Sequence, residues 1–170
     1  MGHSATGALD SVIQLPSAQA NKTGFSSGTE TEDHFIIRNG KEFAGTHLIL
    51  DLWEATSLDN LKHMEAAMRE SVAVSGATLL HIHLHHFTPS GGISGVAVLA
   101  ESHISVHTWP ERDGATLDVY VCNVTCDNSD KAEKLYAMLM QSLAPEEVMV
   151  ERVGRGRDLP LKKKHLAAVR

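Results

Sequence analysis

Alternating apolar and polar residues predict β-strands through the middle of the chain. In the segment FAGTHLILDLW, which starts at Phe43, the residues Leu48, Leu50 and Leu52 form one row and less apolar residues form the other. A period of two is typical of a strand with one buried face. Strand-like patterns recur in four further segments: residues 77–87, 94–111, 115–123 and 146–153. We therefore expect five strands, with the ordered part of the chain beginning near Phe43.

Two segments between these strands have apolar residues at helical spacing instead. In the first, the apolar positions lie three or four residues apart: Leu58, Leu61, Met64, Met68 and Val72. Thr56 or Ser57 is expected to cap the N-terminus of this helix, and Gly76 is expected to end it. The second helix is expected from about Ser129 to Leu143, with four residues facing inward: Ala132, Leu135, Leu139 and Leu143.

The order of these elements predicts an α+β fold. Strands joined by short turns pair antiparallel, and each helix offers one apolar face. The expected architecture is therefore a two-layer α/β sandwich, with a mainly antiparallel sheet and the helices on one face. Residues 36–156 form the expected domain. Residues 1–35 are rich in Ser, Thr, Gly and Ala without periodicity and are expected to be disordered, and residues 157–170 are expected to be a basic tail.

Composition and charge narrow the class of protein. A chain of 170 residues is the length of one domain, and its net charge of −6 gives no general attraction to nucleic acid or to an anionic membrane. Cys122 and Cys126 are too few for a disulfide framework, and no segment resembles a signal peptide or reaches the length of a membrane span. We therefore expect a cytoplasmic protein. Its 11 histidines point to proton transfer or metal binding.

The segment SGVAVLAESHISVHTWPE carries an unusual set of polar residues within an apolar pattern. These residues are Ser94, Glu101, Ser102, His103 and His107. Both alternating faces of the segment look buried, and a buried polar group is costly unless it finds a partner. A functional role therefore competes with the simpler interpretation that these residues face solvent from an antiparallel strand.

Hydrolase and metal-site interpretations of these polar residues are disfavoured. Ser102 lacks the Gly-x-Ser-x-Gly turn that exposes a hydrolase nucleophile. The residues His81, His83 and His85 share one face of a predicted strand, but alternate residues lie roughly 6–7 Å apart along a strand, which is awkward for one metal ion. An exposed or hydrogen-bonded polar row is the favoured interpretation, and no metal site is expected.

The polar motifs instead resemble those of a known family. GISGVAVLAESHISVHTWPE is similar to the core of the pyruvoyl-dependent S-adenosylmethionine decarboxylase proenzymes of bacteria and archaea. The Glu-Ser-His triplet at 101–103, the His-Thr-Trp-Pro-Glu run at 107–111 and Cys122 follow the order and approximate spacing of that family. The resemblance extends from about Phe43 to Val153.

The resemblance implies a self-processing enzyme that supplies polyamine (spermidine) synthesis. It implies cleavage between Glu101 and Ser102: the Ser102 hydroxyl attacks the preceding carbonyl, the ester undergoes β-elimination, and loss of ammonia leaves a pyruvoyl group. The ketone of this cofactor would form a Schiff base with the substrate and delocalise the carbanion left by decarboxylation. The products would be chains of residues 1–101 and 102–170, in a dimer of cleaved protomers.

The resemblance also implies roles for particular residues. It matches His107 to a histidine that assists the elimination, Ser94 to a Ser or Thr implicated in processing, and Cys122 to the cysteine that returns a proton to the product carbon. Three residues are expected at the substrate: Phe43 against the adenine, Phe87 lining the pocket, and Glu101 at the ribose or the sulfonium.

Two departures from the family pattern leave the substrate open. Asn123 replaces a glycine that commonly follows the cysteine, and Gly114 stands where tyrosine is frequent. A pyruvoyl-dependent ornithine or arginine decarboxylase on the same scaffold is therefore an alternative. A non-catalytic, histidine-rich metal-binding domain is an alternative of another class.

Overall fold

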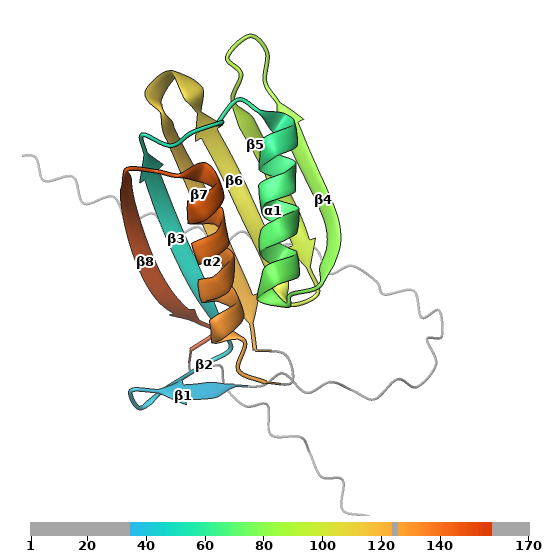
Figure 1. Ribbon diagram of the computed structural model, residues 1–170. Coiled ribbons are helices and arrows are strands. Elements are labelled where there is room, and N and C mark those ends of the chain that lie inside the picture. The colour runs from blue at the N-terminus through green and yellow to red at the C-terminus, as the bar shows by residue number, and fades with distance from the viewer. Residues whose placement is uncertain (1–34, 124–125, 158–170) are drawn as a thin grey trace, which may run out of the picture. The chain divides into compact units, whose positions relative to one another are not determined.

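A six-stranded antiparallel sheet is the largest element of the fold (Figure 1). The computed structural model describes residues 35–123 and 126–157, so the expected disordered extension and basic tail lie almost wholly outside the described residues. The strands lie in the order β4-β5-β6-β7-β3-β8, and every neighbouring pair is antiparallel. Their bounds are Gly45–Trp53 for β3, Leu79–His86 for β4, Ile93–Leu99 for β5, Ser102–Trp109 for β6, Gly114–Cys122 for β7 and Glu147–Arg155 for β8.

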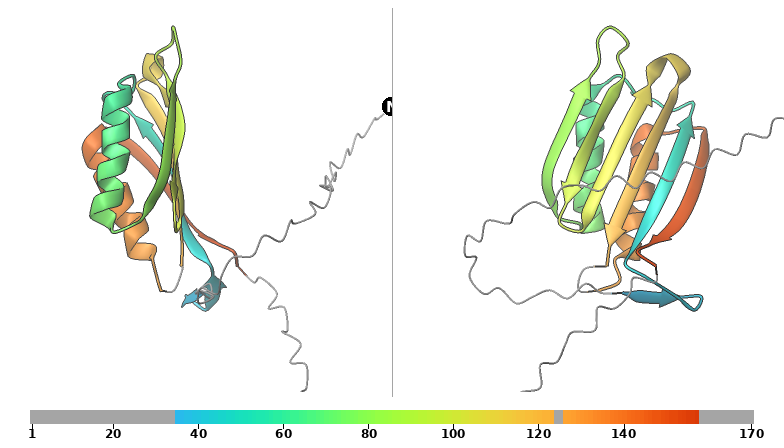
Figure 2. Two further views of the ribbon diagram at one scale, coloured as in Figure 1. Left: turned by 90° about the vertical axis from the view of Figure 1, so that its right-hand side faces the viewer. Right: turned by 180° about the vertical axis from the view of Figure 1, so that it is seen from behind.

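Two helices cover one face of this sheet. Figure 2 shows α1 (Leu61–Ser75) and α2 (Ser129–Leu143) side by side on that face. The predicted row Leu48, Leu50 and Leu52 points at them and is fully buried. It belongs to one continuous core that includes the inward residues of both helices, among them Met64, Met68, Leu135 and Leu139. The predicted two-layer α/β sandwich is therefore confirmed.

The start of α1 differs from the prediction. Asn60 caps the helix, because its Oδ1 accepts a hydrogen bond of 3.1 Å from the His63 N–H. Thr56, one of the two expected caps, instead donates its hydroxyl to a carbonyl at the end of α2. The predicted cap was wrong because Leu58, although at helical spacing, is buried before the helix begins. Gly76 ends the helix as predicted, at a φ of 75° that favours glycine.

The segment 94–111, which we expected to be one strand, is a hairpin followed by the short 3-10 helix η1 (Pro110–Arg112). β5 and β6 pair antiparallel, and the chain turns at Ala100 and Glu101. The apolar alternation does not break at this two-residue turn, so the pattern alone does not reveal it. As a result, the Glu101–Ser102 bond lies where the chain leaves the turn and enters β6.

A two-stranded sheet precedes the six-stranded one. β1 (Ile36–Arg38) and β2 (Lys41–Phe43) form a hairpin, so the expectation that order begins near Phe43 was wrong. The hairpin turns at Asn39 and Gly40, whose φ values are 54° and 72°. Because Asn-Gly with two positive φ angles is typical of a tight β-turn, the sequence did carry this signal.

The face of the six-stranded sheet that points away from α1 and α2 carries no helix of the described chain (Figure 2, left). We call it the open face. It holds several large apolar side chains that are about half exposed: Ile49, Trp53, Val98, Trp109 and Met149. No described helix is long and apolar enough to cross a membrane. The open face therefore leaves several large apolar side chains that no described helix covers.

Candidate active site

Three of the predicted functional residues, Glu101, Ser102 and Cys122, meet His103 at the turn between β5 and β6, at the lower end of the sheet in Figure 1. The Cys122 N–H, at the end of β7, donates a hydrogen bond of 2.9 Å to the Glu101 carbonyl. A donor at this oxygen draws electron density from the carbonyl carbon, which is the atom next to Ser102 along the chain. We call the group of Glu101, Ser102, His103 and Cys122 the Ser102 end.

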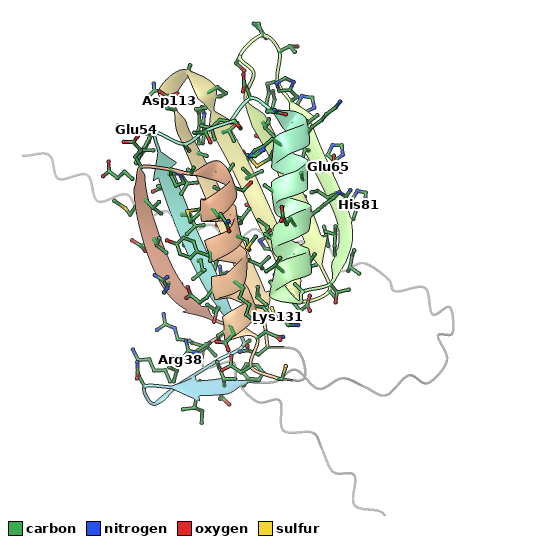
Figure 3. All side chains as sticks on the ribbon, viewed as in Figure 1. Arg38, Glu54, Glu65, His81, Asp113 and Lys131 are labelled. Carbon is green, nitrogen blue, oxygen red and sulfur yellow. The ribbon has the colours of Figure 1, made fainter. Side chains whose placement is uncertain are left out.

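The Glu101 side chain is held from two elements. Its Oε1 accepts a hydrogen bond of 2.9 Å from the Lys131 ammonium of α2, and its Oε2 accepts one of 3.0 Å from the Thr78 N–H. Figure 3 marks Lys131 at the lower end of α2. Burial alone would raise the pKa of this carboxyl, but the hydrogen bonds from Lys131 and Thr78 outweigh it and hold the pKa below its usual range. Glu101 is therefore an ionised and fixed side chain.

Ser102 has an imidazole within hydrogen-bond distance. Its Oγ lies 3.2 Å from Nδ1 of His103, the next residue in β6. The His103 ring meets the edge of the Tyr120 ring on β7, with 5.8 Å between the ring centroids. Both Ser102 and His103 are partly buried. The serine hydroxyl and the imidazole therefore form a pair at the start of the strand.

Cys122 is a free and partly buried thiol on the open face. Burial together with a hydrogen bond to this thiol raises the pKa of Tyr120 to about 12. On the backbone side, the Asn128 amide donates to the Cys122 carbonyl at 2.9 Å, while Asn123 accepts from the Asn128 N–H at 3.0 Å. Asn123, which departs from the family pattern, thus connects the residue after β7 to Asn128, the N-cap of α2.

A hydrogen-bonded chain of polar side chains crosses the open face beside Cys122. Arg155 of β8 lies 2.9 Å from Nδ1 of His47, and Nε2 of His47 lies 3.0 Å from Asp118. Asp118 also accepts a hydrogen bond of 2.8 Å from the Ser105 hydroxyl of β6. With Arg155 donating to Nδ1, His47 carries its proton on Nε2 and donates it to Asp118. The chain thus ties β8, β3, β7 and β6 together.

Ser94 and His107 form a second pair, which lies elsewhere. The Ser94 Oγ is 2.8 Å from Nδ1 of His107, because the two residues face each other across β5 and β6. Trp109 stacks on His107 with 6.4 Å between the centroids. Phe87, at the end of β4, is 46 % exposed and meets the edge of the His85 ring. We call the group of Ser94, His107, Trp109 and Phe87 the His107 end.

The structure does not bring the two ends together within one chain. Ser102 begins β6 and His107 lies five residues further along the same strand. A strand advances about 3.3 Å per residue, so the two positions are roughly 16–17 Å apart. Phe43 lies near the Ser102 end, because Gly45 pairs with Cys122, whereas Phe87 lies at the His107 end. The predicted site residues therefore divide into two separate groups.

Two cavities accompany these groups. One, of about 610 Å³, is lined by the Phe43 side chain together with basic residues that include Arg38, Lys41 and Arg152. The other, of about 560 Å³, lies at the end of the sheet that holds His107 and is lined by six residues: Asp51, Trp53, Trp109, Glu111, Arg112 and Thr116. Two indole rings and two carboxylates in one cavity offer favourable contacts to a cation.

The histidine row of β4 does not form a metal site in the described part of the chain. Within residues 35–123 and 126–157, no group of three or more His, Cys, Asp or Glu side chains is arranged to hold a metal ion. His81, His83 and His85 lie on the open face of the outer strand β4, where His81 is labelled in Figure 3. All three are exposed to solvent.

Comparison with known proteins decides the family. Residues 46–156 match the family model described as S-adenosylmethionine decarboxylase. The match spans both the Ser102 end and the His107 end. The chain belongs to the S-adenosylmethionine decarboxylase family.

Relatives support this membership along nearly their whole length. The chain is 38% identical over 112 residues to the S-adenosylmethionine decarboxylase proenzyme of Thermomicrobium roseum, which covers 66% of this chain and 93% of the relative. It is 41% identical over 114 residues to the proenzyme of Methanococcus maripaludis, covering 66% and 89%. The crystal structure of the adenosylmethionine decarboxylase from Aquifex aeolicus matches with a TM-score of 0.61 at 31% identity, over 67% of this chain and 92% of that one.

Several side chains of this S-adenosylmethionine decarboxylase domain were not predicted from the sequence. Lys131 contacts Glu101, Tyr120 contacts Cys122, and Asp118 belongs to the polar chain beside Cys122, but none of the three lies in a motif that we recognised. The polar residues of β7 did carry a signal, because Asp118 and Tyr120 alternate with buried residues on a strand that ends in Cys122. Lys131 carried none, since its partner is 30 residues away.

Proposed function

We propose that this chain cleaves itself between Glu101 and Ser102, and that residue 102 becomes the pyruvoyl group with which the enzyme decarboxylates S-adenosylmethionine. As a member of the family, the chain is an S-adenosylmethionine decarboxylase proenzyme, which is cleaved autocatalytically and supplies aminopropyl groups for spermidine synthesis. The origin of the pyruvoyl group from Ser102 is the proposed part. The observation that carries it is the carbonyl of Glu101, the residue joined to Ser102 by the peptide bond, which accepts a hydrogen bond from the Cys122 N–H.

The residues around position 102 fit a ketone made from a serine. A pyruvoyl ketone supplies an electron sink for the charge left on the substrate when carbon dioxide leaves. Cys122 ends the strand that pairs with the start of β6, so its thiol is well placed to return a proton to the product carbon. Tyr120 keeps its own proton over a wide pH range, because burial raises its pKa to about 12, and it supports the thiol through their hydrogen bond.

The second part of the proposal is that His107 and Ser94 act on Ser102 of another copy of the chain. Within one copy the two ends are roughly 16–17 Å apart along β6, which no hydrogen bond spans. Two sheets that pack face to face lie only about 10 Å apart, and their side chains interdigitate. A histidine on one open face therefore reaches the facing sheet far more readily than the far end of its own strand.

The open face supports a symmetric dimer of this kind. A two-fold interface pairs the same surface of both copies, so one pairing of a Ser102 end with a His107 end generates a second, identical pairing. The apolar residues of this face that are about half exposed, such as Trp53, Trp109 and Met149, are those that a packed second sheet would bury. In such a dimer, the partner subunit's His107 assists the β-elimination that releases the 1–101 chain, and the partner subunit's Ser94 orients that imidazole.

The substrate contacts are proposed at both ends. S-adenosylmethionine carries a sulfonium cation and an adenine ring, and the His107-end cavity combines the indoles of Trp53 and Trp109 with the carboxylates of Asp51 and Glu111. Phe43 and Phe87 are proposed to line the adenine pocket, as the family resemblance implies. Contact of Glu101 with the ribose or the sulfonium is proposed for the cleaved enzyme only, since in the uncut chain its carboxylate binds Lys131 and Thr78.

The proposed compartment is the cytoplasm. Both cysteines of the described chain are free thiols, which is the usual state in a reducing compartment. No partner of the nucleic-acid or membrane class is proposed, because the net charge of −6 favours neither.

Intact-mass measurement of the purified protein tests the proposal. We expect chains of residues 1–101 and 102–170, with a pyruvoyl group at the new N-terminus, and we expect Ser102→Ala to stay uncut and inactive. Two chains from Ser102→Ala would rule out Ser102 as the processing residue. A panel of S-adenosylmethionine, ornithine and arginine tests the substrate, with carbon dioxide release expected from the first alone.

A further inference from the structure

The nucleophile of the proposed cleavage already has a base beside it. We propose that His103 is the general base of the first step, in which the Ser102 hydroxyl attacks the Glu101 carbonyl. This inference rests on the proposed cleavage between Glu101 and Ser102 and deepens it. It assigns the first step to a residue of the same chain and leaves only the later elimination to the Ser94–His107 pair.

The distance between Ser102 and His103 supports this assignment. Nδ1 of His103 lies 3.2 Å from the Ser102 Oγ, at the upper limit of the range for a direct proton transfer. In the tautomer with its proton on Nε2, His103 presents a lone pair to the hydroxyl. The ring is partly buried and rests against Tyr120 of the neighbouring strand, which limits its rotation. Within the described chain, no other imidazole forms a hydrogen bond with the Ser102 hydroxyl.

The electrophile is prepared by different residues. The Cys122 N–H holds the carbonyl oxygen of Glu101 at 2.9 Å and is placed to stabilise the negative charge that develops there during attack. Lys131 and Thr78 fix the Glu101 side chain from two sides, so the carbonyl keeps its orientation. Lys131 is thus a positioning residue, whereas His103 contacts the reacting oxygen of Ser102.

The step balances without any added reactant. The Ser102 hydroxyl gives its proton to Nδ1 of His103 as its oxygen bonds to the carbonyl carbon, and the carbonyl electron pair moves to the oxygen held by the Cys122 N–H. When this pair returns, the carbon–nitrogen bond breaks. The protonated His103 gives its proton to the departing Ser102 nitrogen. The product is an ester between Glu101 and the Ser102 side chain, with a free amino group on Ser102, and His103 is neutral again.

The competing base, His107, is engaged elsewhere. Its Nδ1 pairs with the Ser94 hydroxyl at 2.8 Å, five residues further along β6. Even in the proposed dimer, the partner subunit's His107 would approach Ser102 only after assembly. The geometry therefore separates two proton transfers: His103 serves ester formation inside one chain, and His107 serves the elimination that consumes the ester.

Hydroxylamine distinguishes the two steps, because it cleaves esters and leaves amides intact under mild conditions. Full-length chains are made by cell-free synthesis and followed by denaturing gel and intact mass, with and without hydroxylamine. We expect His103→Gln and His103→Ala to slow cleavage by about 10²–10⁴-fold, the usual contribution of a general base, and to give no hydroxylamine-sensitive ester. We expect His107→Ala to accumulate the ester, so that hydroxylamine cuts it between residues 101 and 102.

Two controls separate loss of the base from loss of the fold. His81→Gln changes an exposed histidine on the same face of the sheet, opposite Val98, which in turn lies opposite His103. It should cleave at the parent rate. Free imidazole should restore cleavage to His103→Ala, because it replaces the missing base in the space left by the ring. A folded His103→Ala protein, with the far-UV circular dichroism of Ser102→Ala, that imidazole does not rescue would overturn the proposal.

Other outcomes also decide the matter. Cleavage of His103→Gln at the parent rate would overturn the role of His103, as would accumulation of the ester in either His103 variant, since the acyl shift would then have occurred without it. Failure of the parent chain to cut, or cutting of Ser102→Ala, would instead overturn the proposed cleavage itself.

Discussion

The Ser102 end and the His107 end of the sheet differ in whether the peptide bond to be cut lies among their polar side chains. At the Ser102 end, a hydroxyl, an imidazole and a hydrogen-bonded carbonyl come together within one chain. At the His107 end, a serine–imidazole pair and the indole of Trp109 are exposed to solvent, and the proposed cleavage site lies at the other end of β6. Local pairing of neighbouring strands therefore brings together every group of the proposed site for forming the ester. The rest of the proposed chemistry depends on bringing two distant regions of the fold together, which one chain does not do.

The largest expected effect comes from mixing two inactive chains. His107→Ala alone should stop at the ester, and Ser102→Ala alone stays uncut. In a hybrid dimer, the intact Ser102 of the first chain meets the intact His107 of the second. After co-refolding of equal amounts of the two proteins, random pairing makes about half of all dimers hybrids, and one of the two sites in each hybrid is intact. We therefore expect cleavage at about one quarter of all sites, always in the His107→Ala chain. Intact mass identifies which chain is cut.

The control for this experiment is a mixture of the same two proteins without refolding, in which no hybrid forms. Failure to cut any of the His107→Ala chain after refolding, although native mass spectrometry detects the hybrids, would show that the two ends do not combine across copies.

The next effect is expected from Cys122→Ala, which alters the Ser102 end after cleavage. Cleavage should continue, because the acyl shift uses the backbone N–H of residue 122. Turnover of S-adenosylmethionine should fall by about 10²–10⁴-fold, the usual contribution of a positioned acid. Misplaced protonation should also convert the N-terminal group of the 102–170 chain to alanine, which intact mass detects during turnover. Parent-rate turnover without that mass shift would mean that the thiol serves packing alone. Cys126→Ala is the matched control, since Cys126 is exposed.

Lys131→Met should destabilise the Ser102 end by a smaller amount, about 1–3 kcal/mol, because it leaves the buried Glu101 carboxylate with one hydrogen bond fewer. Urea unfolding in the uncut Ser102→Ala background measures this. The lowered pKa of Glu101 contributes stability that is present at neutral pH and is lost as the pH falls through that lowered pKa. Without Lys131, the pKa of Glu101 is less depressed in the folded chain, so the variant should lose less stability on acidification than the parent.

Lys134→Met is the control for the Lys131 substitution, because Lys134 is an exposed residue of the same helix. It should change neither the unfolding free energy at neutral pH nor its acid dependence. Equal acid profiles for the two variants would argue against the ion pair as the cause.

The smallest effect is expected outside both ends. Asn60→Ala removes the N-cap of α1 and should lower the unfolding free energy of the uncut chain by about 1 kcal/mol. Because α1 supports the sheet without touching the Ser102 hydroxyl, the rate of ester formation should not change. A slower rate in this variant would mean that cleavage responds to helix stability in general, which would weaken the distinction between the two ends.

The hydrophobic pattern predicted most of the scaffold. Leu48, Leu50 and Leu52 identified a buried strand face, and Leu135 and Leu139 identified the inner side of α2, because these periods follow directly from burial. The turn at Ala100 and Glu101 was not predicted, because a two-residue turn leaves the alternation of apolar and polar residues unbroken. The missed β1–β2 hairpin was readable from Asn39-Gly40, which lies beside a segment that we had taken to be disordered.

The site was only partly predictable for a different reason. Short motifs placed Ser102, His107 and Cys122 in one family pattern, but a pattern along the chain says nothing about distance in space. The separation of His107 from Ser102 follows from their lying on one extended strand, and the contact of Lys131 with Glu101 follows from how α2 packs. The first was readable from the predicted strand over residues 94–111, whereas the second is a property of the tertiary fold.

The turn between β5 and β6 has a further consequence for the mature molecule. A cut after Glu101 leaves β3, β4, β5 and α1 on one fragment and β6, β7, β8 and α2 on the other. In the sheet order β4-β5-β6-β7-β3-β8, three of the five pairs of neighbouring strands then join different fragments. The two fragments are interleaved, and neither can leave without dismantling the sheet.

The cut therefore turns a folding problem for one chain into an assembly problem for two. In the uncut chain, all strand pairing is intramolecular, and the effective concentration of the strands is set by the length of chain between them. The separated fragments, once denatured, must instead meet by diffusion. Recovery of the denatured mature enzyme should be bimolecular and should slow on dilution, while that of the uncut chain should not. The proenzyme therefore allows the two fragments of the mature protein to fold together once, as one chain, before they are separated.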